Sequence, residues 1–402
     1  MHLAILTQYY PPEIGAPQRR LSELAQRIQA RGHRVTVLTA MPNYPTGKIH
    51  RGYKGLLRWE LLDKIEVVRT FIYPTQKASF LHRLTNYFSF VLSSLLLGTF
   101  ALDKPDYLLV ESPPLFLGIS ALWLSKIKGA RLIFNVSDLW PESAARLGLL
   151  SKTSLAYRIS QKLEALCYQR AWLITGQSHS ILGDIQKRFP DRHTYHLSNG
   201  VDTAKFGKEQ RTLEARSRLS DSEKLVVFYA GLHGLAQGLD QIIEAARALK
   251  TEPRIQFVLM GDGPEKNSLI EQANLLPNIS FLDPRPGNEI PAFLASADIV
   301  LVPLKMYIPG AVPSKLYEAM ASGRPVITVA TGEPADIVEQ HNTGIAVAPG
   351  DITSLVEAVK RLAVDADLRA ELGLRGRSAA ERYFNRDTIA AEFIQYLEMY
   401  TP

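Results

Sequence analysis

The chain has 402 residues, more than one domain usually contains, so we expect two domains. Its 46% hydrophobic and 21% charged residues are typical of a globular protein with large cores. A single cysteine, Cys167, excludes an internal disulfide and indicates a reducing compartment. The opening MHLAILTQYY lacks the regions of a signal peptide, and we interpret it as containing a buried strand.

The net charge of +6 is shared unequally between the two halves. Residues 1–200 carry 25 basic and 13 acidic side chains, whereas residues 201–402 carry 21 and 27. The resulting charges of +12 and −6 indicate that the first half meets an anionic partner. We expect no nucleic acid, because the basic residues are scattered and match no nucleic-acid-binding motif. An anionic membrane surface or a lipid diphosphate fits better.

The first half opens with a βαβ unit, the building block of a parallel sheet. A loop at 9–16 separates its first strand from its helix. The elements predicted here are strand 3–6, helix 17–30, and strands 34–38, 67–70, 107–110, 132–136 and 172–175.

The stretch Phe80–Leu102 is the most lipid-like part of the chain. Its uncharged run of 19 residues is long enough to span a bilayer, but its serine, threonine and asparagine residues disfavour a spanning helix. A buried core helix and a membrane-interfacial helix both fit the composition better. Basic residues that suit docking on an anionic bilayer precede the uncharged run: Arg58, Lys64, Arg69, Lys77 and Arg83.

The strand and helix pattern restarts after a turn-like, charged segment at 199–223, which we interpret as a hinge. We therefore assign residues 1–200 to a first domain and 201–386 to a second, with the final helix at 387–402 expected to pack back onto the first. The predicted elements are strands 225–230, 255–259, 298–302, 325–329 and 344–347, and helices 239–249, 314–323 and 388–400.

The helix that opens at Ser314 carries a candidate anion site. Ser314 is expected to be its N-cap, and Lys315, Glu318 and Ser322 share a polar face. Free N–H groups and the positive helix end favour an anion, Lys315 adds a full charge, and Glu318 can accept hydrogen bonds from a diol. These groups match a phosphate joined to a ribose, although an ordinary capped helix explains the same residues. The opposite face is apolar: Leu316, Ala319 and Met320.

Six ordered motifs run through the chain: PPEIGAPQRRLSELAQRIQARGHRVTVLT, NVSDLWPES, SNGVDTAKF, GLHGLAQGLDQIIEA, MGDGPEKNSL and PSKLYEAMASGRPVI. Together they resemble a retaining family 4 glycosyltransferase of the GT-B fold. They are most similar to bacterial colanic-acid, O-antigen and capsule enzymes of the L-fucosamine-transferase type. The resemblance implies an α/β protein of two Rossmann-like, doubly wound parallel-sheet domains facing an interdomain cleft.

The resemblance also implies an enzyme that binds a nucleotide sugar of the UDP type in its second domain. The sugar, a hexosamine such as N-acetyl-fucosamine, would pass to a polyprenyl-diphosphate-linked saccharide in bacterial surface polysaccharide synthesis. The implied location is cytoplasmic and peripheral on the inner face of the membrane. Donor sugar, acceptor sugar and linkage are not encoded in any motif.

The donor residues implied by the resemblance lie mostly in the second domain. Glu318 would hold the ribose, but the family's first glutamate is replaced by Gly310, and its Arg and Lys in the glycine-rich loop by Leu232 and Gln237. Lys315 would therefore neutralise the diphosphate, aided by the backbone of Ser314. The further donor-binding candidates are Gly15, Gly231, Gly234, Gln237 and, at the nucleobase, Arg285.

Candidates for catalysis and acceptor binding lie in both domains. Asp138 would orient an acceptor hydroxyl or stabilise charge, or would simply cap the segment after it. His233 resembles a histidine that contacts sugar or phosphate, although an exposed loop histidine explains it nearly as well. Lys315 is the third catalytic candidate. The acceptor-binding candidates are Glu13, Arg19, Trp140 and Glu142.

The pair Asp365 and Asp367 has the spacing of a metal-binding DxD, but it lies in a solvated turn between two predicted helices. A divalent ion needs further oxygen ligands, so we expect neither a metal nor another cofactor. The rival hypotheses are a sugar-nucleotide 2-epimerase of the same fold and a non-catalytic sugar-nucleotide-binding scaffold. A dehydrogenase is disfavoured, because no GxGxxG follows either leading strand.

Overall fold

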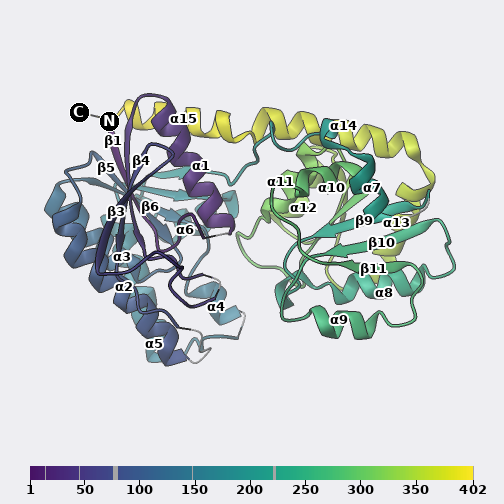
Figure 1. The fold of residues 1–402 in the computed structure, drawn as a ribbon, viewed down its shortest axis with the longest axis horizontal. Helices are drawn as coiled ribbons and strands as arrows, with labels where there is room; N and C mark the ends of the chain where they lie inside the picture. Colours follow the sequence, from purple (N-terminus) through teal and green to yellow (C-terminus); the bar gives the residue numbers. More distant parts are fainter. Residues whose placement is uncertain (14, 45, 76–79, 147, 221–222, 402) are drawn as a thin grey trace. The chain divides into compact units, whose positions relative to one another are not determined.

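The computed structural model describes residues 1–13, 15–44, 46–75, 80–146, 148–220 and 223–401 (Figure 1). The chain forms two compact units. Unit 1 comprises Met1–Ser198 together with Ile389–Pro402, and unit 2 comprises Asn199–Thr388. The boundaries expected at residues 200 and 387 lie close to these.

The described residues of unit 1 form an eight-stranded sheet in the order β3-β4-β2-β1-β5-β6-β7-β8. All neighbours are parallel except β3 and β4, an antiparallel pair at one edge that the sequence pattern did not predict. The strands are β1 (His2–Leu6), β2 (Arg34–Ala40), β3 (Leu57–Leu62), β4 (Ile65–Thr70), β5 (Tyr107–Ser112), β6 (Arg131–Val136), β7 (Leu173–Gly176) and β8 (Thr194–His196).

Helices cover both faces of this sheet, because successive side chains of a strand point to opposite faces. Leu3 of β1 belongs to one core cluster and Ala4 to another, and both are fully buried. Phe393 and Leu397 of the last helix complete the cluster of Leu3. The helices are α1 (Ala16–Ala30), α2 (Phe80–Ala101), α3 (Leu117–Lys128), α4 (Glu142–Arg146), α5 (Leu155–Arg170), α6 (His179–Arg188) and α15 (Arg386–Glu398).

Unit 2 contains an all-parallel sheet in the order β11-β10-β9-β12-β13-β14. Its strands are β9 (Leu225–Ala230), β10 (Ile255–Met260), β11 (Ile279–Leu282), β12 (Ile299–Pro303), β13 (Val326–Val329) and β14 (Gly344–Val347). Its helices are α7 (Leu213–Leu219), α8 (Asp240–Ala248), α9 (Lys266–Gln272), α10 (Ile290–Ser296), α11 (Ser314–Ala321), α12 (Glu333–Gln340), α13 (Ile352–Val364) and α14 (Ala366–Tyr383). Two doubly wound parallel-sheet units are thus confirmed.

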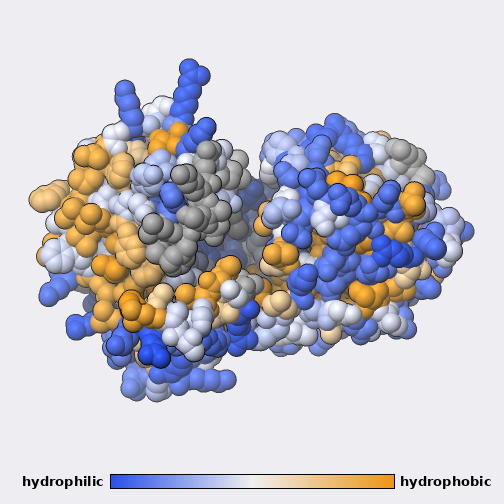
Figure 2. Space-filling model, turned by 90° about the horizontal axis from the view of Figure 1, so that it is seen from below, coloured by the Kyte–Doolittle hydropathy of each residue, from blue (hydrophilic) through white to orange (hydrophobic). Residues whose placement is uncertain are grey.

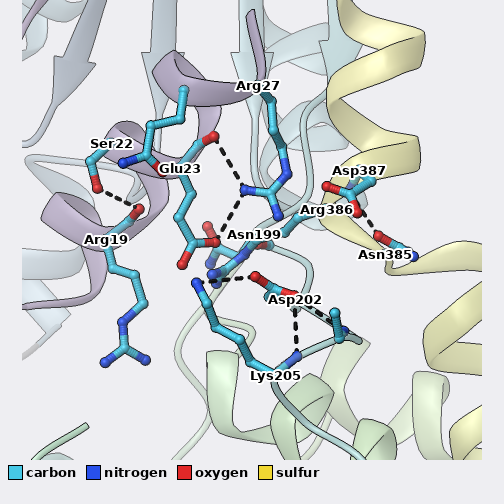
Figure 3. Close-up of polar contacts among 12 residues, drawn as sticks. Arg19, Ser22, Glu23, Arg27, Asn199, Asp202, Lys205, Asn385, Arg386 and Asp387 are labelled. Carbon is cyan, nitrogen blue, oxygen red and sulfur yellow. Dashed lines mark hydrogen bonds and ion pairs between the residues drawn. The ribbon is translucent and has the colours of Figure 1, made fainter. Parts of the chain in front are cut away.

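The sequence predicts a hinge made of turns at 199–223, but the described residues of this segment contain regular secondary structure. Val201 pairs with Asn385, and α7 lies inside the segment. The Asp202 carboxylate accepts hydrogen bonds from the backbone of Lys205 and pairs with its ammonium at 3.1 Å (Figure 3). The composition of the segment reflected a solvated surface rather than a lack of structure.

Helix α2 is partly core and partly surface. Phe90 is fully buried, whereas Phe100 is 87% exposed. No helix in the described ranges is long and apolar enough to cross a membrane. The expectation that Arg69 faces a bilayer is wrong: it is completely buried, and its guanidinium pairs with Glu60 at 2.5 Å. Lys77 lies outside the described residues.

Each sheet has one point at which the strand order reverses direction. In unit 1 it lies between β1 and β5, and in unit 2 between β9 and β12. The connections that leave two such strands run to opposite sides, so a crevice opens beyond their carboxyl ends, where ligands of open α/β sheets bind. These two positions are therefore the places to seek a functional site.

Candidate functional site

The switch point of unit 2 brings Gly231, after β9, against Lys315 in the first turn of α11. A β-carbon added to Gly231 would lie 2.7 Å from the Nζ of Lys315 and 2.9 Å from the hydroxyl of Tyr229. That hydroxyl donates to the carbonyl of Leu232 at 2.7 Å and fixes the loop. Glycine therefore leaves the space in which the ammonium lies against the loop backbone.

The ammonium of Lys315 is not neutralised. No carboxylate partner for it occurs among the described residues. The backbone N–H groups of Ser314 and Lys315 also lack an acceptor in the described part of the chain. A cation and free N–H groups at a helix start together form a site for an anion such as phosphate.

The predicted cap of α11 needs correction. Pro313 is the N-cap, and Ser314 is the first helical residue, with no side-chain cap hydrogen bond. Because proline fixes an extended entry without offering a side-chain acceptor, the N–H groups of Ser314 and Lys315 stay open, whereas that of Leu316 donates to the carbonyl of Pro313. Ser322 is also not on a polar face: it is fully buried and donates to the carbonyl of Glu318 at 2.9 Å.

Glu318 lies one turn after Lys315 and is half-buried. Its carboxylate has no hydrogen-bond or ion-pair partner among the described residues, so it is open to a ligand hydroxyl. Gly310, where the resemblance implies a second glutamate, has φ +78. This left-handed conformation strains any residue with a β-carbon, so the loop is built for glycine here.

His233 does not have the placement expected of a catalytic residue. Its ring is fully buried, and neither ring nitrogen has a partner in the described part of the structure. Burial, with a contribution from Lys266, lowers its pKa, so the ring is neutral. Its backbone N–H donates to Asp262 and its carbonyl accepts from Glu265, which ties two loops together. The structure gives His233 a supporting role and shows that it is not an exposed loop histidine.

The rest of the glycine-rich loop is largely occupied by the protein itself. The N–H of Gly231 donates to the carbonyl of Met260 at 2.8 Å, so it is not open to a phosphate. Gly234 is buried beside Gln237, whose side-chain oxygen is buried without a partner in the described chain. Arg285, in contrast, is exposed in the loop after β11. These residues stay candidates for the donor.

The switch point of unit 1 holds a buried polar network that the sequence pattern missed. Arg20 of α1 donates to Glu111, at the end of β5, at 2.5 Å and to the hydroxyl of Ser137 at 2.8 Å. The other Glu111 oxygen accepts from Asn135 at 2.5 Å, and Asn135 accepts from Thr175 at 2.6 Å. The only sequence signal was that Glu111, Asn135 and Thr175 lie near the carboxyl ends of buried strands.

This network fixes the residue before Asp138. The hydroxyl of Ser137 also donates to Glu111 at 2.6 Å, its N–H donates to Ser112, and its carbonyl accepts from Gln177 at 2.5 Å. A backbone held at three points leaves its neighbour little freedom. Asp138 therefore has a defined position at the carboxyl edge of the sheet.

Asp138 is a partly buried acid whose charge is poorly compensated. Burial raises its pKa, and hydrogen bonds from the Ser143 hydroxyl, at 2.8 Å, and from the Leu139 backbone only partly oppose this. Both contacts come from the segment that follows Asp138, so the carboxylate also holds that segment in place. A carboxyl group whose proton affinity is raised in this way is typical of a functional site.

Two acceptor-binding candidates have structural partners instead. Glu142 is held by Arg146, Lys152 and the hydroxyl of Tyr157 at 2.8–3.0 Å. Burial works against its charge, but these hydrogen bonds prevail and lower its pKa to about 2. Trp140 packs edge-on against Phe116 at a ring separation of 5.8 Å. Glu142 therefore supports α5, not Trp140, and its carboxylate is occupied, whereas the half-buried Trp140 stays an acceptor-binding candidate.

Glu13 is likewise occupied. Its buried carboxylate accepts from the N–H groups of Tyr10, Asn43 and Tyr44, which joins the loops after β1 and β2. Burial raises its pKa, and these hydrogen bonds oppose the shift. The expected ligand contact is therefore replaced by a structural one.

Arg19 and Gly15 remain open to a ligand at the start of α1. The guanidinium of Arg19 has no partner among the described residues, and it points away from the paired side chains around it (Figure 3). Gly15 precedes the helix without a side-chain cap. Arg19 is thus a second uncompensated cation, in unit 1, that can meet an anionic substrate.

The DxD pair has a structural explanation. Asp365 is the N-cap of α14 and accepts from the backbone of Leu368 at 2.8 Å. No cluster of three or more His, Cys, Asp or Glu side chains suited to a metal occurs among the residues that the structure describes. The absence of a metal stays an expectation.

Comparisons with known proteins give the same picture as the fold. A family model described as "Glycosyl transferase 4-like domain" matches residues 15–200, and one described as "Glycosyl transferases group 1" matches residues 210–379. The solved sucrose-phosphate synthase from Thermosynechococcus elongatus superposes with a TM-score of 0.78 at 18% identity, over 99% of this chain and 98% of that one. Anabaena HepE in complex with UDP gives 0.73 at 20% identity, over 99% and 100%.

These matches define a two-domain enzyme that transfers sugars, and the chain belongs to the GT-B glycosyltransferases. Among curated proteins it is similar to the Escherichia coli (strain K12) protein named "Putative colanic acid biosynthesis glycosyl transferase WcaI". The two are 28% identical over 402 residues, which cover 96% of this chain and 97% of the relative.

Proposed function

We propose that this glycosyltransferase moves a hexosamine-type sugar from a UDP-linked donor to a lipid-linked saccharide, with retention at the anomeric carbon. The observation that carries the proposal is the pairing of Lys315 with Gly231 at the switch point of unit 2. An uncompensated cation, open helix N–H groups and an unpaired Glu318 within two turns fit a diphosphate followed by a ribose.

The donor residues act on the bond that breaks. As the bond between the anomeric carbon and the diphosphate oxygen lengthens, negative charge grows on the diphosphate. Lys315 and the N–H groups of Ser314 and Lys315 stabilise that charge, because they are in place before the reaction. Glu318 accepts hydrogen bonds from the ribose and holds the nucleotide in position.

Retention requires either a covalent nucleophile or attack from the face that the diphosphate leaves. Gly310 stands where the resemblance implies a glutamate near the sugar, so no side chain is proposed as a covalent nucleophile. The acceptor oxygen would then attack from the same face that the diphosphate leaves, and its proton would pass to the leaving phosphate oxygen. Asp138 orients the acceptor hydroxyl, and Arg19 pairs with acceptor phosphate.

The acceptor is proposed from charge. Unit 1 contains most of the basic half of the chain, and Arg19 is uncompensated at its switch point. A polyprenyl-diphosphate saccharide offers the matching negative charge, and the relative named for colanic acid biosynthesis supports a surface-polysaccharide role. We place the enzyme at the inner face of the cytoplasmic membrane, without a metal cofactor.

One experiment tests the proposal directly. Purified enzyme is incubated with a panel of UDP-, GDP- and dTDP-sugars and a lipid-linked saccharide, and the products are read by mass spectrometry and anomeric NMR. The expected product is a lengthened lipid-linked saccharide with the donor's anomeric configuration. EDTA should not change the amount of product formed. Inverted product contradicts retention, and activity that EDTA abolishes and Mn²⁺ restores contradicts the metal-free site.

The two rivals give different products in the same assay. A sugar-nucleotide 2-epimerase would return the donor with one inverted carbon and leave the acceptor unchanged. A sugar-nucleotide-binding scaffold would bind donor in calorimetry and yield nothing with any acceptor. The replaced glutamate at Gly310 and the neutral Leu232 and Gln237 are the observations that keep the scaffold in consideration.

A further inference from the structure

Three helices of unit 1 form one surface layer. The ring nitrogen of Trp123 in α3 donates to the hydroxyl of Thr99 in α2 at 3.1 Å. Helix α3 also approaches α5 so closely that a β-carbon on Gly118 would lie 2.5 Å from the sulfur of Cys167. The space-filling view shows hydrophobic residues gathered over unit 1 (Figure 2). The layer is therefore continuous across α2, α3 and α5.

The outward side of this layer is apolar at helical spacing. Helix α2 exposes Phe88, Leu92, Leu96 and Phe100, each four residues apart. Helix α3 exposes Ile119, Trp123 and Ile127 at the same spacing. Helix α5 adds Leu155, Ile159 and Leu166. We call these residues the α2/α3/α5 face, and contiguous apolar surface of this extent marks an interaction site.

The polar residues of α2 do not interrupt the face. Asn86 and Ser94, which made the helix less hydrophobic in sequence, are buried. The Asn86 amide donates to the carbonyl of Tyr73 at 2.7 Å, and the Ser94 hydroxyl donates to Ser120 of α3 at 3.0 Å. Internal hydrogen bonds thus take up the polar groups and leave the outward stripe apolar.

The charges on the layer are of one sign. Neither α2 nor α3 contains an aspartate or glutamate, and the one acid of α5, Glu164, is buried and paired with Arg188 at 2.9 Å. No ion pair to the basic side chains of α3 and α5 occurs in the described part of the chain. These basic side chains are Lys126, Arg158, Lys162 and Arg170, whereas Lys128 interacts electrostatically with Asp103.

We infer that the α2/α3/α5 face docks on an anionic lipid bilayer, with its apolar stripes in the headgroup region and its cations against lipid phosphates. Apolar side chains flanked by uncompensated cations are typical of interfacial helices. A second copy of the chain is a poorer occupant, because it would bring like charges together. The inference extends the proposed function by naming the surface that brings the enzyme to a lipid-linked acceptor.

Vesicle co-sedimentation tests the inference without donor or acceptor. The full chain is expected to bind vesicles of equal parts phosphatidylglycerol and phosphatidylcholine, to bind pure phosphatidylcholine much less, and to dissociate as salt rises. Replacing Lys126, Arg158 and Lys162 by Gln should weaken binding about a hundredfold, since each cation near an anionic surface contributes about a factor of five. L96S with F100S should also weaken binding.

Matched changes on unit 2 serve as controls. Gln at Lys250, Lys360 and Arg361, and Ser at the exposed Leu213 and Leu374, should leave vesicle binding unchanged. Equal loss in the controls, or no binding of the full chain at low salt, overturns the inference. So does a dimer in light scattering that L96S with F100S dissociates, because the occupant is then a second copy. UDP affinity of every variant should stay unchanged, so failure here is distinct from failure of the proposed function.

Discussion

The Nζ of Lys315 would lie 2.7 Å from a β-carbon placed on Gly231, so these two residues share one space at the switch point of unit 2. Lys315→Ala is expected to weaken UDP binding about 10- to 100-fold, since a hydrogen bond to a charged group contributes about 1.5–3 kcal/mol. Gly231→Ala should also weaken it, because the methyl group displaces the ammonium. Calorimetry measures both, with Lys250→Ala as the control; unchanged affinity in Lys315→Ala would refute the phosphate assignment.

Replacing Glu318 distinguishes binding of the ribose from binding of the diphosphate. Glu318→Ala should weaken UDP binding about tenfold, because one hydrogen bond to a carboxylate is lost, and should leave inorganic diphosphate binding unchanged. Lys315→Ala should weaken both. Glu357→Ala, an exposed acid elsewhere in unit 2, is the control. Equal loss of UDP and diphosphate in Glu318→Ala would show that Glu318 acts only by shaping the helix.

Asp138→Asn should reduce turnover at least a hundredfold while raising stability at neutral pH. Burial raises the pKa of Asp138, so its charged form is disfavoured in the folded state. The free-energy cost of the ionised carboxylate is fully present above the pKa of the folded state. It is lost as pH falls through that pKa towards the lower pKa of the unfolded chain, so the stability advantage of the variant should shrink in acid. Thermal unfolding across pH measures this. A variant that is less stable at neutral pH would identify Asp138 as structural.

His233→Leu replaces the buried ring with an apolar side chain that has no unpaired nitrogens. We expect a gain of about 1 kcal/mol in the free energy of unfolding, because unpaired buried polar atoms are removed. Burial lowers the histidine pKa, so the wild-type chain should lose stability as pH falls below about 6.5, and the variant should lose less. Turnover should persist. A hundredfold loss of turnover in a stable variant would restore a catalytic role.

Glu111→Gln removes the carboxylate that Arg20 and Asn135 share. Breaking this buried pair should cost about 3 kcal/mol of stability and lower kcat, with KM for the donor unchanged, since the network positions Asp138. Glu164→Gln breaks a similarly buried pair with Arg188 away from the strand ends and should lower stability alone. The same loss of kcat in both variants would show that Glu111→Gln lowers kcat by destabilising the fold and not by moving Asp138.

Periodicity predicted the architecture well because parallel strands buried on both faces are short apolar runs. The βαβ start and the returning C-terminal helix were visible for this reason, and the fold class is confirmed. The edge strand β3 was missed because its residues alternate between half-buried and exposed, with no apolar run. Helix α7 was missed because its residues are mostly polar and only Ala215 and Leu219 are buried.

The surroundings of a candidate residue could be predicted where its neighbours are close in sequence and could not be predicted where its partners come from other segments. The placement of Lys315 and Glu318 follows from one short helix. Glu13 and Glu142 resembled free acids because their partners come from other segments, such as Asn43 and Tyr157. Burial of His233 depends on packing between two loops, which no spacing of residues in one loop reveals.

The first strand and the last helix of the chain share one buried core cluster, with consequences during synthesis. Phe393 and Leu397 belong to the same buried cluster as Leu3, and the Tyr107 hydroxyl donates to the carbonyl of Leu397 at 2.8 Å. A nascent chain therefore cannot complete its first unit until the last helix has left the ribosome at the end of translation. Until then the apolar surface around Leu3 stays partly uncovered, and transiently exposed apolar surface favours aggregation.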